Sequence, residues 1–284
     1  MVSLNIDVTR QVTMADVETT MIDLLAYDDG VMAQAARHHL GSGGGRARAS
    51  LALQSAHALK LPFETMRAIS AACELLHNAS LVHDDLQDRD TVRRGEEAVW
   101  KKFGSNTAIC LGDLMVSAAY AAIASAPVDR MSEMIAHMHK RVSDVIGGQH
   151  ADLENDCTTI AEYNEVARMK SGPLLGLPVE LCLMAANFSD HVSAAMAASD
   201  AIAIAYQTTD DISDVERDIE VGGLNFLMVV EGDMTSRTLA ARLHASEYSR
   251  AAIAIAKTLP YGSGHGLIAL AEKFVPLLAI GEAA

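Results

Sequence analysis

The chain has 284 residues, and the simplest organisation for this length is a single domain over residues 1–284. Half of the residues are hydrophobic while only 4% are aromatic, a balance typical of a closely packed helical core and not of a β-sandwich. The formal net charge of −15 and the few aromatic rings argue against nucleic acid as a partner, because phosphate backbones bind basic surfaces.

Apolar residues recur at helical spacing along nearly the whole chain, and the interruptions coincide with Gly, Pro, Ser and Asp. In chain order, the predicted helices span residues 15–25, 31–39, 46–59, 63–88, 107–123, 131–155, 160–169, 174–187, 191–215, 235–259 and 266–280. Two predicted breaks fall at Ser171-Gly172-Pro173 and at Gly222-Gly223. Because almost no segment alternates with a period of two, we expect one all-α domain.

The hydropathy, the first residues and the cysteines of the chain all favour a cytoplasmic protein. The longest uncharged run, residues 114–128, is too short to span a bilayer comfortably, so we expect no stable membrane insertion. The first residues lack the basic and apolar regions of a signal peptide. The cysteines show no metal-binding spacing and indicate buried thiols in a reducing compartment; they are Cys73, Cys110, Cys157 and Cys182.

The motif Asp-Asp-x-x-Asp occurs twice, each time at the end of an apolar helix. The first copy comprises Asp84, Asp85 and Asp88, and the second comprises Asp210, Asp211 and Asp214. On a helix, positions i and i+4 share a face, so the first and last aspartate of each copy aim at one point. One such motif fits a solvated helix end equally well, but two copies favour a shared role. Hard divalent cations, above all Mg²⁺, bind such carboxylates together with substrate phosphates, so the pair of motifs predicts a pyrophosphate site.

Basic residues lie close to the first motif. Arg93 and Arg94 follow it, and guanidinium groups bind phosphate oxygens in a bidentate manner. A salt bridge from these arginines to Asp90 or to the glutamates at 96 and 97 is the alternative. His77 precedes the motif on the same apolar helix and fits a structural role and a binding role equally well.

Three further features resemble parts of a site but are weak when taken alone. A glycine loop, Gly43 to Gly45, opens a helix and exposes N–H groups that suit an anion. Lys170 stands at a predicted helix break. Gly147 and Gly148 interrupt a helical segment, where each glycine costs about 1 kcal/mol, and indicate either a kink or close helix packing.

Taken in order, these elements resemble the trans-isoprenyl diphosphate synthases, or polyprenyl synthetases, from about Gly43 to Asn225. The two aspartate motifs match the two aspartate-rich motifs of that family, and Arg93-Arg94-Gly95 follows the first as the family requires. Further matching elements are Tyr206-Gln207 before the second motif, Gly148-Gln149 with Asp152, and Lys170-Ser171. The resemblance implies antiparallel helices around a deep central cavity, Mg²⁺ (three ions), and a homodimer.

The resemblance also implies roles for these residues. Metal ions would be held at Asp84, Asp88, Asp152, Asp210 and Asp214, with Asp85 and Asp211 in supporting roles. Arg93 and Lys170 would hold the phosphates of an allylic prenyl diphosphate, with Gln149, Ser171 and Gln207 as further substrate contacts. Isopentenyl diphosphate would bind at Arg48, His77 and Arg94 and at the position of Gly45. The metals would stabilise the departing pyrophosphate, and the double bond of isopentenyl diphosphate would then add head-to-tail.

Two departures from the family pattern affect the second substrate. The glycine loop of the family contains a lysine for isopentenyl diphosphate, and Gly45 stands in its place here. The lysine that the family usually carries after the second motif is also absent from Gly222-Gly223-Leu224-Asn225. Two other functions therefore stay open: a terpene synthase-like lyase that ionises a prenyl diphosphate without adding isopentenyl diphosphate, and a regulatory subunit of a heteromeric synthase.

Product length is expected to depend on the helix that leads into the first motif. Residues four and five positions before Asp84 lie about 5.4 Å, one turn, below it. In the family, an aromatic side chain there limits the product to short chains. The small residues Ser80 and Ala79 occupy these positions, so we expect products of at least twenty carbons. Close helix packing is the alternative reason for small residues here, with the floor of the cavity deeper, at Leu76 or on residues 111–120.

Overall fold

A computed structural model describes residues 11–26, 28–154 and 156–278, and these residues are almost entirely helical. The prediction of an all-α fold is confirmed. The chain divides into two compact units, with the division between Ile135 and Ala136 inside helix α7 (Met131–Glu154). The expectation of a single domain over residues 1–284 stays a prediction.

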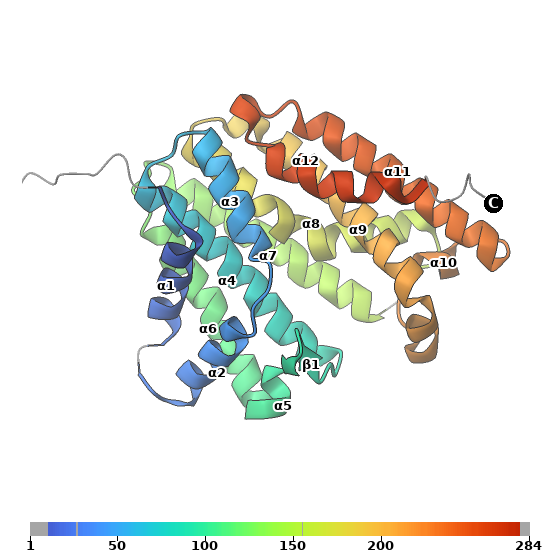
Figure 1. The fold of residues 1–284 in the computed structure, drawn as a ribbon, viewed down its shortest axis with the longest axis horizontal. Coiled ribbons are helices and arrows are strands. Elements are labelled where there is room, and N and C mark those ends of the chain that lie inside the picture. Colours follow the sequence, from blue (N-terminus) through green and yellow to red (C-terminus); the bar gives the residue numbers. More distant parts are fainter. Residues whose placement is uncertain (1–10, 27, 155, 279–284) are drawn as a thin grey trace, which may run out of the picture. The chain divides into compact units, whose positions relative to one another are not determined.

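The first unit is built around one long helix. It contains α1 (Met14–Leu25), α2 (Val31–Gly41), α3 (Ala47–Ala58), α4 (Phe63–Gln87), β1 (Val92–Arg93), β2 (Glu96–Glu97), α5 (Val99–Phe103) and α6 (Ser105–Ala124). Helix α4 packs against α6 and α3, and α1 also contacts it (Figure 1). Small residues allow these close contacts, since Ala68, Ala71, Ala72 and Ala79 of α4 are all buried.

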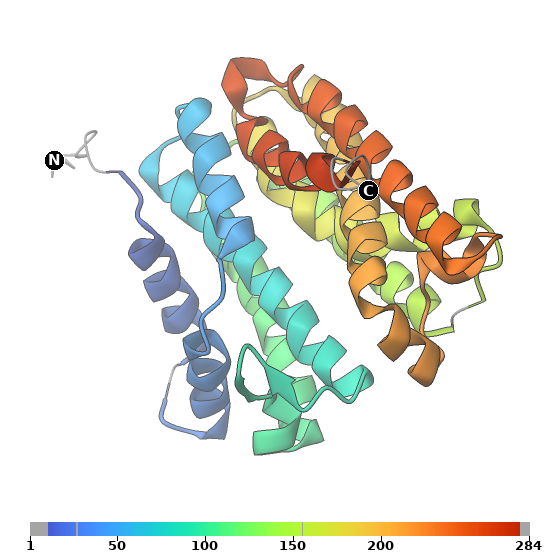
Figure 2. The ribbon, with the colours of Figure 1, turned by 45° about the vertical axis from the view of Figure 1, so that its right-hand side comes forward.

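The second unit consists mainly of long helices, with shorter ones between and beside them. It contains most of α7, α8 (Ile160–Ala185), η1 (Ser189–His191), α9 (Val192–Val221), α10 (Phe226–Val229), α11 (Met234–Ala256), η2 (Pro260–Gly262), α12 (His265–Ala271) and η3 (Glu272–Leu278). Helix α9 packs against both α8 and α11, and α12 contacts α11 and α9 (Figure 2). Thr159 begins α8 with a capping box that includes Glu162.

The predicted break at Ser171-Gly172-Pro173 is wrong, because α8 runs without interruption through both Pro173 and Pro178. Proline removes a backbone hydrogen bond and normally ends or kinks a helix. Here every residue from 172 to 184 is buried, and the burial of this apolar segment offsets the lost hydrogen bonds. The helix therefore continues where the local sequence predicts a stop.

The glycine pair of α7 serves close packing, since the backbone stays helical through Gly147 and Gly148. A Cβ atom at Gly148 would lie 2.3 Å from the backbone nitrogen of Lys170. Only glycine allows α7 and α8 to approach this closely. Of the two interpretations of this pair, packing is the one that the structure supports.

Other boundaries differ from the prediction in smaller ways. Helix α9 extends six residues beyond 215, to Val221, and Gly222 ends it with a left-handed φ of 69°. The expectation that the second aspartate motif stands at a helix end is therefore wrong, because Asp210, Asp211 and Asp214 lie inside α9. Helix α5 and the short β1–β2 hairpin were not predicted. The segment predicted as one helix from 266 is α12 followed by the 3₁₀ helix η3. Positions 155 and 280, where two predicted helices end, lie outside the described residues.

The expectation of buried cysteines is only partly correct. Cys73 and Cys182 are buried, whereas Cys110 is exposed on α6 and Cys157 is half-buried in the segment before α8.

Among the described helices, α6 alone has the length and hydropathy of a membrane span. It packs along α4, and its buried residues include Leu111, Met115 and Ile123. A core helix of a globular unit passes the same test of length and composition, so this observation is weak evidence for insertion.

Candidate functional site

The first aspartate motif ends α4 and gives its three carboxylates different environments. Asp88 is exposed at the C-cap, Asp84 is half-buried, and Asp85 is only 1% exposed. Asp85 accepts a hydrogen bond from Nε of Arg93 at 2.7 Å. Burial raises the pKa of Asp85, and the bonded guanidinium of Arg93 opposes that shift. Asp85 therefore holds Arg93 in place.

Arg93 and Arg94 belong to the hairpin between β1 and β2. Arg94 and Gly95 have φ values of 55° and 84°, the pair of positive values that a two-residue type I′ turn requires. Arg93 is held by Asp85 and also lies 3.8 Å from Asp90, so an ion pair with Asp90 accompanies the contact to the motif. The hairpin therefore fixes both arginines beside the end of α4.

Arg94 packs on the glycine loop that precedes α3. Its guanidinium donates a hydrogen bond to the carbonyl of Gly43, and a Cβ at Gly44 would lie 2.4 Å from its Cζ. Gly44 also has a φ of 111°, so glycine is required there for two reasons. Gly45 differs, because a Cβ would meet nothing within 4 Å. The position where the family carries lysine is thus open space beside a cation.

His77 and Arg48 lie together in the first unit. Nη1 of Arg48 is 3.3 Å from Nε2 of His77. Burial, followed by the positive charges of Arg48 and Arg94, holds the pKa of His77 well below its ordinary value. The imidazole is therefore neutral at pH 7 and adds hydrogen-bonding capacity, not charge, to the arginine cluster.

Part of the anion-binding capacity predicted for the start of α3 is used by the protein itself. The backbone N–H of Ala49 donates to Oε2 of Glu74 at 3.0 Å. Asn78 donates to Glu74 in turn, and Nε2 of His39 lies 3.1 Å from Oδ1 of Asn78. The buried carboxylate of Glu74 thus caps the positive end of α3, a contact that no local motif signals.

In the second unit, Lys170 meets Asp152. Nζ of Lys170 lies 2.5 Å from Oδ2 of Asp152, so a predicted phosphate ligand and a predicted metal ligand form an ion pair. The pair joins α8 to α7 beside the close contact of Gly148 with the backbone of Lys170. Gln149 is buried on the same part of α7, and Ser171 is half-buried next to Lys170.

The second motif places an acidic stripe along α9. Asp210 is exposed and Asp214 is half-buried one turn further on. Asp218 continues the stripe by another turn and was not predicted, although the i+4 spacing from Asp214 signals it. Partial burial raises the pKa of Asp210, and the charges of Asp214 and Asp218 raise it further. A bound cation would relieve this repulsion.

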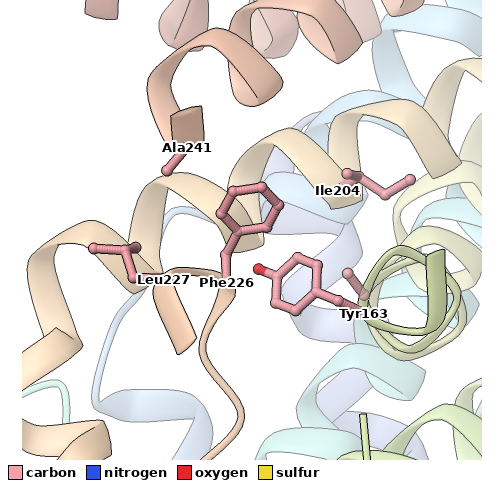
Figure 3. Close-up of a cluster of buried hydrophobic side chains, with 6 residues drawn as sticks. Tyr163, Ile204, Phe226, Leu227 and Ala241 are labelled. Carbon is pink, nitrogen blue, oxygen red and sulfur yellow. The ribbon is translucent and has the colours of Figure 1, made fainter. Parts of the chain in front are cut away.

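Asp211 points the other way, into the core of the second unit. It accepts hydrogen bonds from the hydroxyl of Tyr163 at 2.6 Å, from Nε2 of Gln207 at 2.9 Å and from the backbone N–H of Phe226 at 2.6 Å. Burial raises the pKa of Asp211 to about 6, and these hydrogen bonds oppose the shift. Figure 3 shows Tyr163 and Phe226 side by side in the adjoining apolar cluster. Asp211 therefore positions α10 and Gln207 from within.

Asn225 reinforces this arrangement from the segment after α9. Its side-chain amide donates to the backbone carbonyl of Asp211 at 2.9 Å and to Oδ2 of Asp218 at 2.7 Å. Its Oδ1 accepts from the N–H of Leu227 and so caps α10. Asn225 is thus a structural residue. Its position in Gly222-Gly223-Leu224-Asn225, where the family carries a lysine, does not indicate this role.

The chain-length positions lie on α4 in different environments. Ala79 is buried, with 2% exposure, and Ser80 is half-buried and donates to the carbonyl of His77 at 2.9 Å. Leu76 is buried one turn earlier. Both interpretations of the small residues, space for a chain and close packing, are compatible with this burial.

The donor set fits a hard divalent cation. Asp84 with Asp88, at the end of α4, and Asp210 with Asp214, within α9, present accessible carboxylates one helical turn apart. Mg²⁺ is usually bound by one or two carboxylates and completes its octahedron with water and phosphate oxygens. Among residues 11–26, 28–154 and 156–278, no three carboxylate, imidazole or thiol groups are arranged to hold an ion by themselves.

The fold and these two aspartate motifs define an all-α protein of the isoprenoid synthase type. The family model described as polyprenyl synthetase matches residues 29–255, and the chain belongs to this family. The resemblance inferred from the motifs is thereby confirmed.

Individual relatives of the chain are named as prenyl diphosphate synthases. The chain is 31% identical over 195 residues to a geranylgeranyl pyrophosphate synthase of Geoglobus acetivorans, covering 66% of this chain and 61% of that protein. The aligned part thus spans about three fifths of that relative. A solved structure of the geranylgeranyl pyrophosphate synthetase from Geoglobus acetivorans superposes with a TM-score of 0.79 at 26% identity, over 91% of this chain and 96% of the other. A polyprenyl synthase from Caulobacter crescentus, solved with calcium and isoprenyl diphosphate, shares the fold with a TM-score of 0.80 at 19% identity, over 92% of this chain and 94% of the other.

Proposed function

We propose that the protein is a Mg²⁺-dependent prenyltransferase that condenses an allylic prenyl diphosphate, of the geranyl or farnesyl type, with isopentenyl diphosphate. The observation that carries the proposal is that the three aspartates of each motif differ in burial and in hydrogen bonding. The first and last aspartates are accessible, whereas Asp85 and Asp211 are buried and hydrogen-bonded. Carboxylates left accessible at the end of α4 and along α9 suit metal ions shared with a diphosphate.

Asp84, Asp88, Asp210 and Asp214 would hold the metal ions, and Asp152 would join them on release from Lys170. When bound, the ions would supply Lewis-acid stabilisation of the departing pyrophosphate. The calcium and isoprenyl diphosphate in the Caulobacter relative support the use of a divalent cation by this family.

The remaining steps rest on the residues of this chain. Arg93, which Asp85 orients, would hold a phosphate of the allylic substrate through charge-assisted hydrogen bonds. Lys170 would provide a second cation, with Gln149, Ser171 and Gln207 as neighbouring polar groups. As the carbon–oxygen bond of the allylic diphosphate breaks, these cations offset the negative charge that develops on the leaving group.

The second substrate would use the arginine cluster of the first unit. Arg48 and Arg94 would bind the diphosphate of isopentenyl diphosphate, and neutral His77 would contribute a hydrogen bond. The double bond of this substrate attacks the allylic carbon, and a proton then leaves to the departing pyrophosphate. The cluster compensates in part for the lysine that Gly45 replaces, so we favour transfer over lyase activity.

The product is proposed to be an all-trans chain of at least twenty carbons, because small residues, Ala79 and Ser80, stand at the two positions where the family carries an aromatic side chain to limit product length. A homodimer in the cytoplasm is the expected assembly and location. A lyase is the second candidate, favoured by the absence of lysine at Gly45 and after the second motif. A regulatory subunit is a third, although two complete aspartate motifs give a subunit without catalysis no evident benefit.

Incubation of the purified protein with Mg²⁺ and geranyl or farnesyl diphosphate, with and without isopentenyl diphosphate, separates these functions. Longer prenyl diphosphates that form only with both substrates support the proposal. Hydrocarbon or alcohol released without isopentenyl diphosphate identifies a lyase. No turnover with any of these substrates favours the regulatory subunit.

A further inference from the structure

One carboxylate outside the aspartate motifs contacts the turn of α8 that carries Lys170. Oδ2 of Asp200, on α9, lies 3.5 Å from Nη1 of Arg168. Oδ1 of Asp200 occupies the space beside Gly172, where an added Cβ would lie only 2.4 Å away. Arg168 and Gly172 are one turn apart and therefore share a face of α8, with Lys170 between them on the opposite face. Asp200 thus contacts this turn at both of its ends.

The opposite face of the same turn is held by α7. Gly148 lies against the backbone of Lys170, and Asp152 pairs with its ammonium group. Helix α8 is therefore fixed between Asp200 on one side and α7 on the other. A shift or rotation of α8 at this level would move Nζ of Lys170, and the contacts of Asp200 oppose such a shift.

Asp200 is itself oriented by a buried cation. Nη2 of Arg141, whose side chain is fully buried, lies 3.6 Å from Oδ1 of Asp200 and 3.1 Å from Oε1 of Glu180. His137 lies 2.7 Å from the other oxygen of Glu180. These groups link α7, α8 and α9 in the interior of the second unit. Breaking a buried ion pair is costly, so the charged network fixes the position of Asp200.

We infer that Asp200 is a positioning residue for Lys170: through Arg168 and Gly172 it sets where the lysine ammonium meets a diphosphate. Asp200 does not touch the substrate in this assignment. The inference rests on the proposed function, because it takes Lys170 as a phosphate ligand. Its consequence is that a change at Asp200 affects diphosphate binding only while Lys170 is present.

A double-mutant cycle tests this dependence. The variants are Asp200→Asn, Lys170→Ala and the combination, and the measurement is the affinity for inorganic pyrophosphate with Mg²⁺ by calorimetry. The asparagine keeps the shape beside Gly172 and leaves Arg141 paired with Glu180. We expect Asp200→Asn to weaken binding about tenfold in the native background and less than about twofold when Lys170 is already alanine. In steady-state kinetics the loss should appear in KM for the allylic diphosphate more than in kcat.

Glu165→Gln is the matched control, since Glu165 also pairs with Arg168, at 2.5 Å, but is exposed and does not lie against Gly172. It should leave pyrophosphate binding unchanged. If Asp200→Asn does not fold, Gly172→Ala tests the same contact, because its Cβ would displace the carboxylate without removing a charge.

The possible failures are distinguishable. Equal losses from Asp200→Asn with and without Lys170, or no loss at all, would overturn the positioning role while the proposed function stands. Unchanged pyrophosphate affinity in Lys170→Ala would instead remove Lys170 from the proposed site, and the inference with it.

Discussion

The ammonium group of Lys170 lies 2.5 Å from Oδ2 of Asp152, so two residues expected to bind opposite charges on a metal–diphosphate complex are bound to each other. Each of the two side chains is about a quarter exposed, which leaves the ion pair accessible to solvent and to a competing anion. A diphosphate would take the lysine, and the released carboxylate would become available to a metal ion.

Asp152→Asn should therefore change pyrophosphate binding in opposite directions with and without metal. Without Mg²⁺, affinity should rise about threefold, because Lys170 no longer has to leave a carboxylate partner. With Mg²⁺, affinity should fall, because a metal ligand is lost. Calorimetry in EDTA and in Mg²⁺ measures both, with Asp156→Asn as the control. A change in the same direction under both conditions contradicts the exchange.

The accessible aspartates should matter more for turnover than for folding. We expect Asp84→Ala, Asp88→Ala and Asp210→Ala each to lower kcat by at least about a hundredfold, since about 1.4 kcal/mol of lost barrier reduction is tenfold in rate. Removing one of several neighbouring like charges should leave the melting temperature of the metal-free protein unchanged or raise it. Asp23→Ala, an exposed aspartate of α1, serves as the control. Near-normal kcat in Asp84→Ala would rule out its role as a metal ligand.

Restoring the family lysine is a direct test of the second-substrate site. Gly45→Lys should lower KM for isopentenyl diphosphate, because the position has open space and lies on the loop that Arg94 contacts. Gly44→Lys is the contrasting variant: its φ of 111° and the guanidinium of Arg94 leave no room for a side chain, so we expect lost stability and no gain in binding. An unchanged KM in folded Gly45→Lys would show that another cation fills the place or that this substrate is not used.

Product length should respond to bulk at the small residues of α4. Ala79→Phe is expected to shorten the products, and Ser80→Phe, at a less buried position, should do so with a smaller loss of stability. Chromatography of the dephosphorylated alcohols measures the distribution. Products of the native protein that stop at fifteen carbons would contradict the expected length.

The buried imidazole of His39 should make the first unit sensitive to acid. Burial, with the nearby charge of Arg94, lowers the pKa of His39 from 6.5 to about 4. As the pH falls from 6.5 to 4, the unfolded chain binds a proton at this position and the folded chain does not. The free energy of unfolding should therefore fall by about 3 kcal/mol from this group alone across that window.

His39→Gln isolates the effect, because glutamine can still donate to Asn78 but does not titrate. Denaturant unfolding at pH 7 and pH 4 gives the difference for each protein. The variant should lose less stability than the native protein between these two values, and equal losses would exclude His39 as the cause.

Most helices, and the end of α4 at the first aspartate motif, could be predicted from the sequence because both depend on local patterns. The end of α9 could not, because the helix runs to Val221 and not to the predicted residue 215. The prediction failed at Pro173, where proline normally stops a helix, since the burial that keeps α8 intact comes from segments distant in the chain. The contacts of Glu74 with the start of α3, and of Asn225 with Asp211, are likewise long-range. Nothing in the neighbouring residues indicates them.

The different environments of adjacent aspartates could have been predicted from helix geometry. Asp85 follows buried Val82 by three residues, and Asp211 follows buried Thr208 by three. Each second aspartate therefore continues the inward face of its helix, about 100° from the first. The two copies of the motif contain six aspartates that the motif itself does not distinguish, whereas the helical periodicity separates four accessible carboxylates from two buried ones.

Because Asp211 is buried, folding and catalysis restrict different positions of the second aspartate motif. Asp211 holds Tyr163 and Phe226, so a chain without it loses core contacts before any substrate arrives. In a library of random substitutions sorted only for folded protein, aspartate should persist at 211 while positions 210 and 214 drift. Sorting the same library for turnover should recover all three, so a relative that retains only the middle aspartate would be a folded protein that has abandoned catalysis.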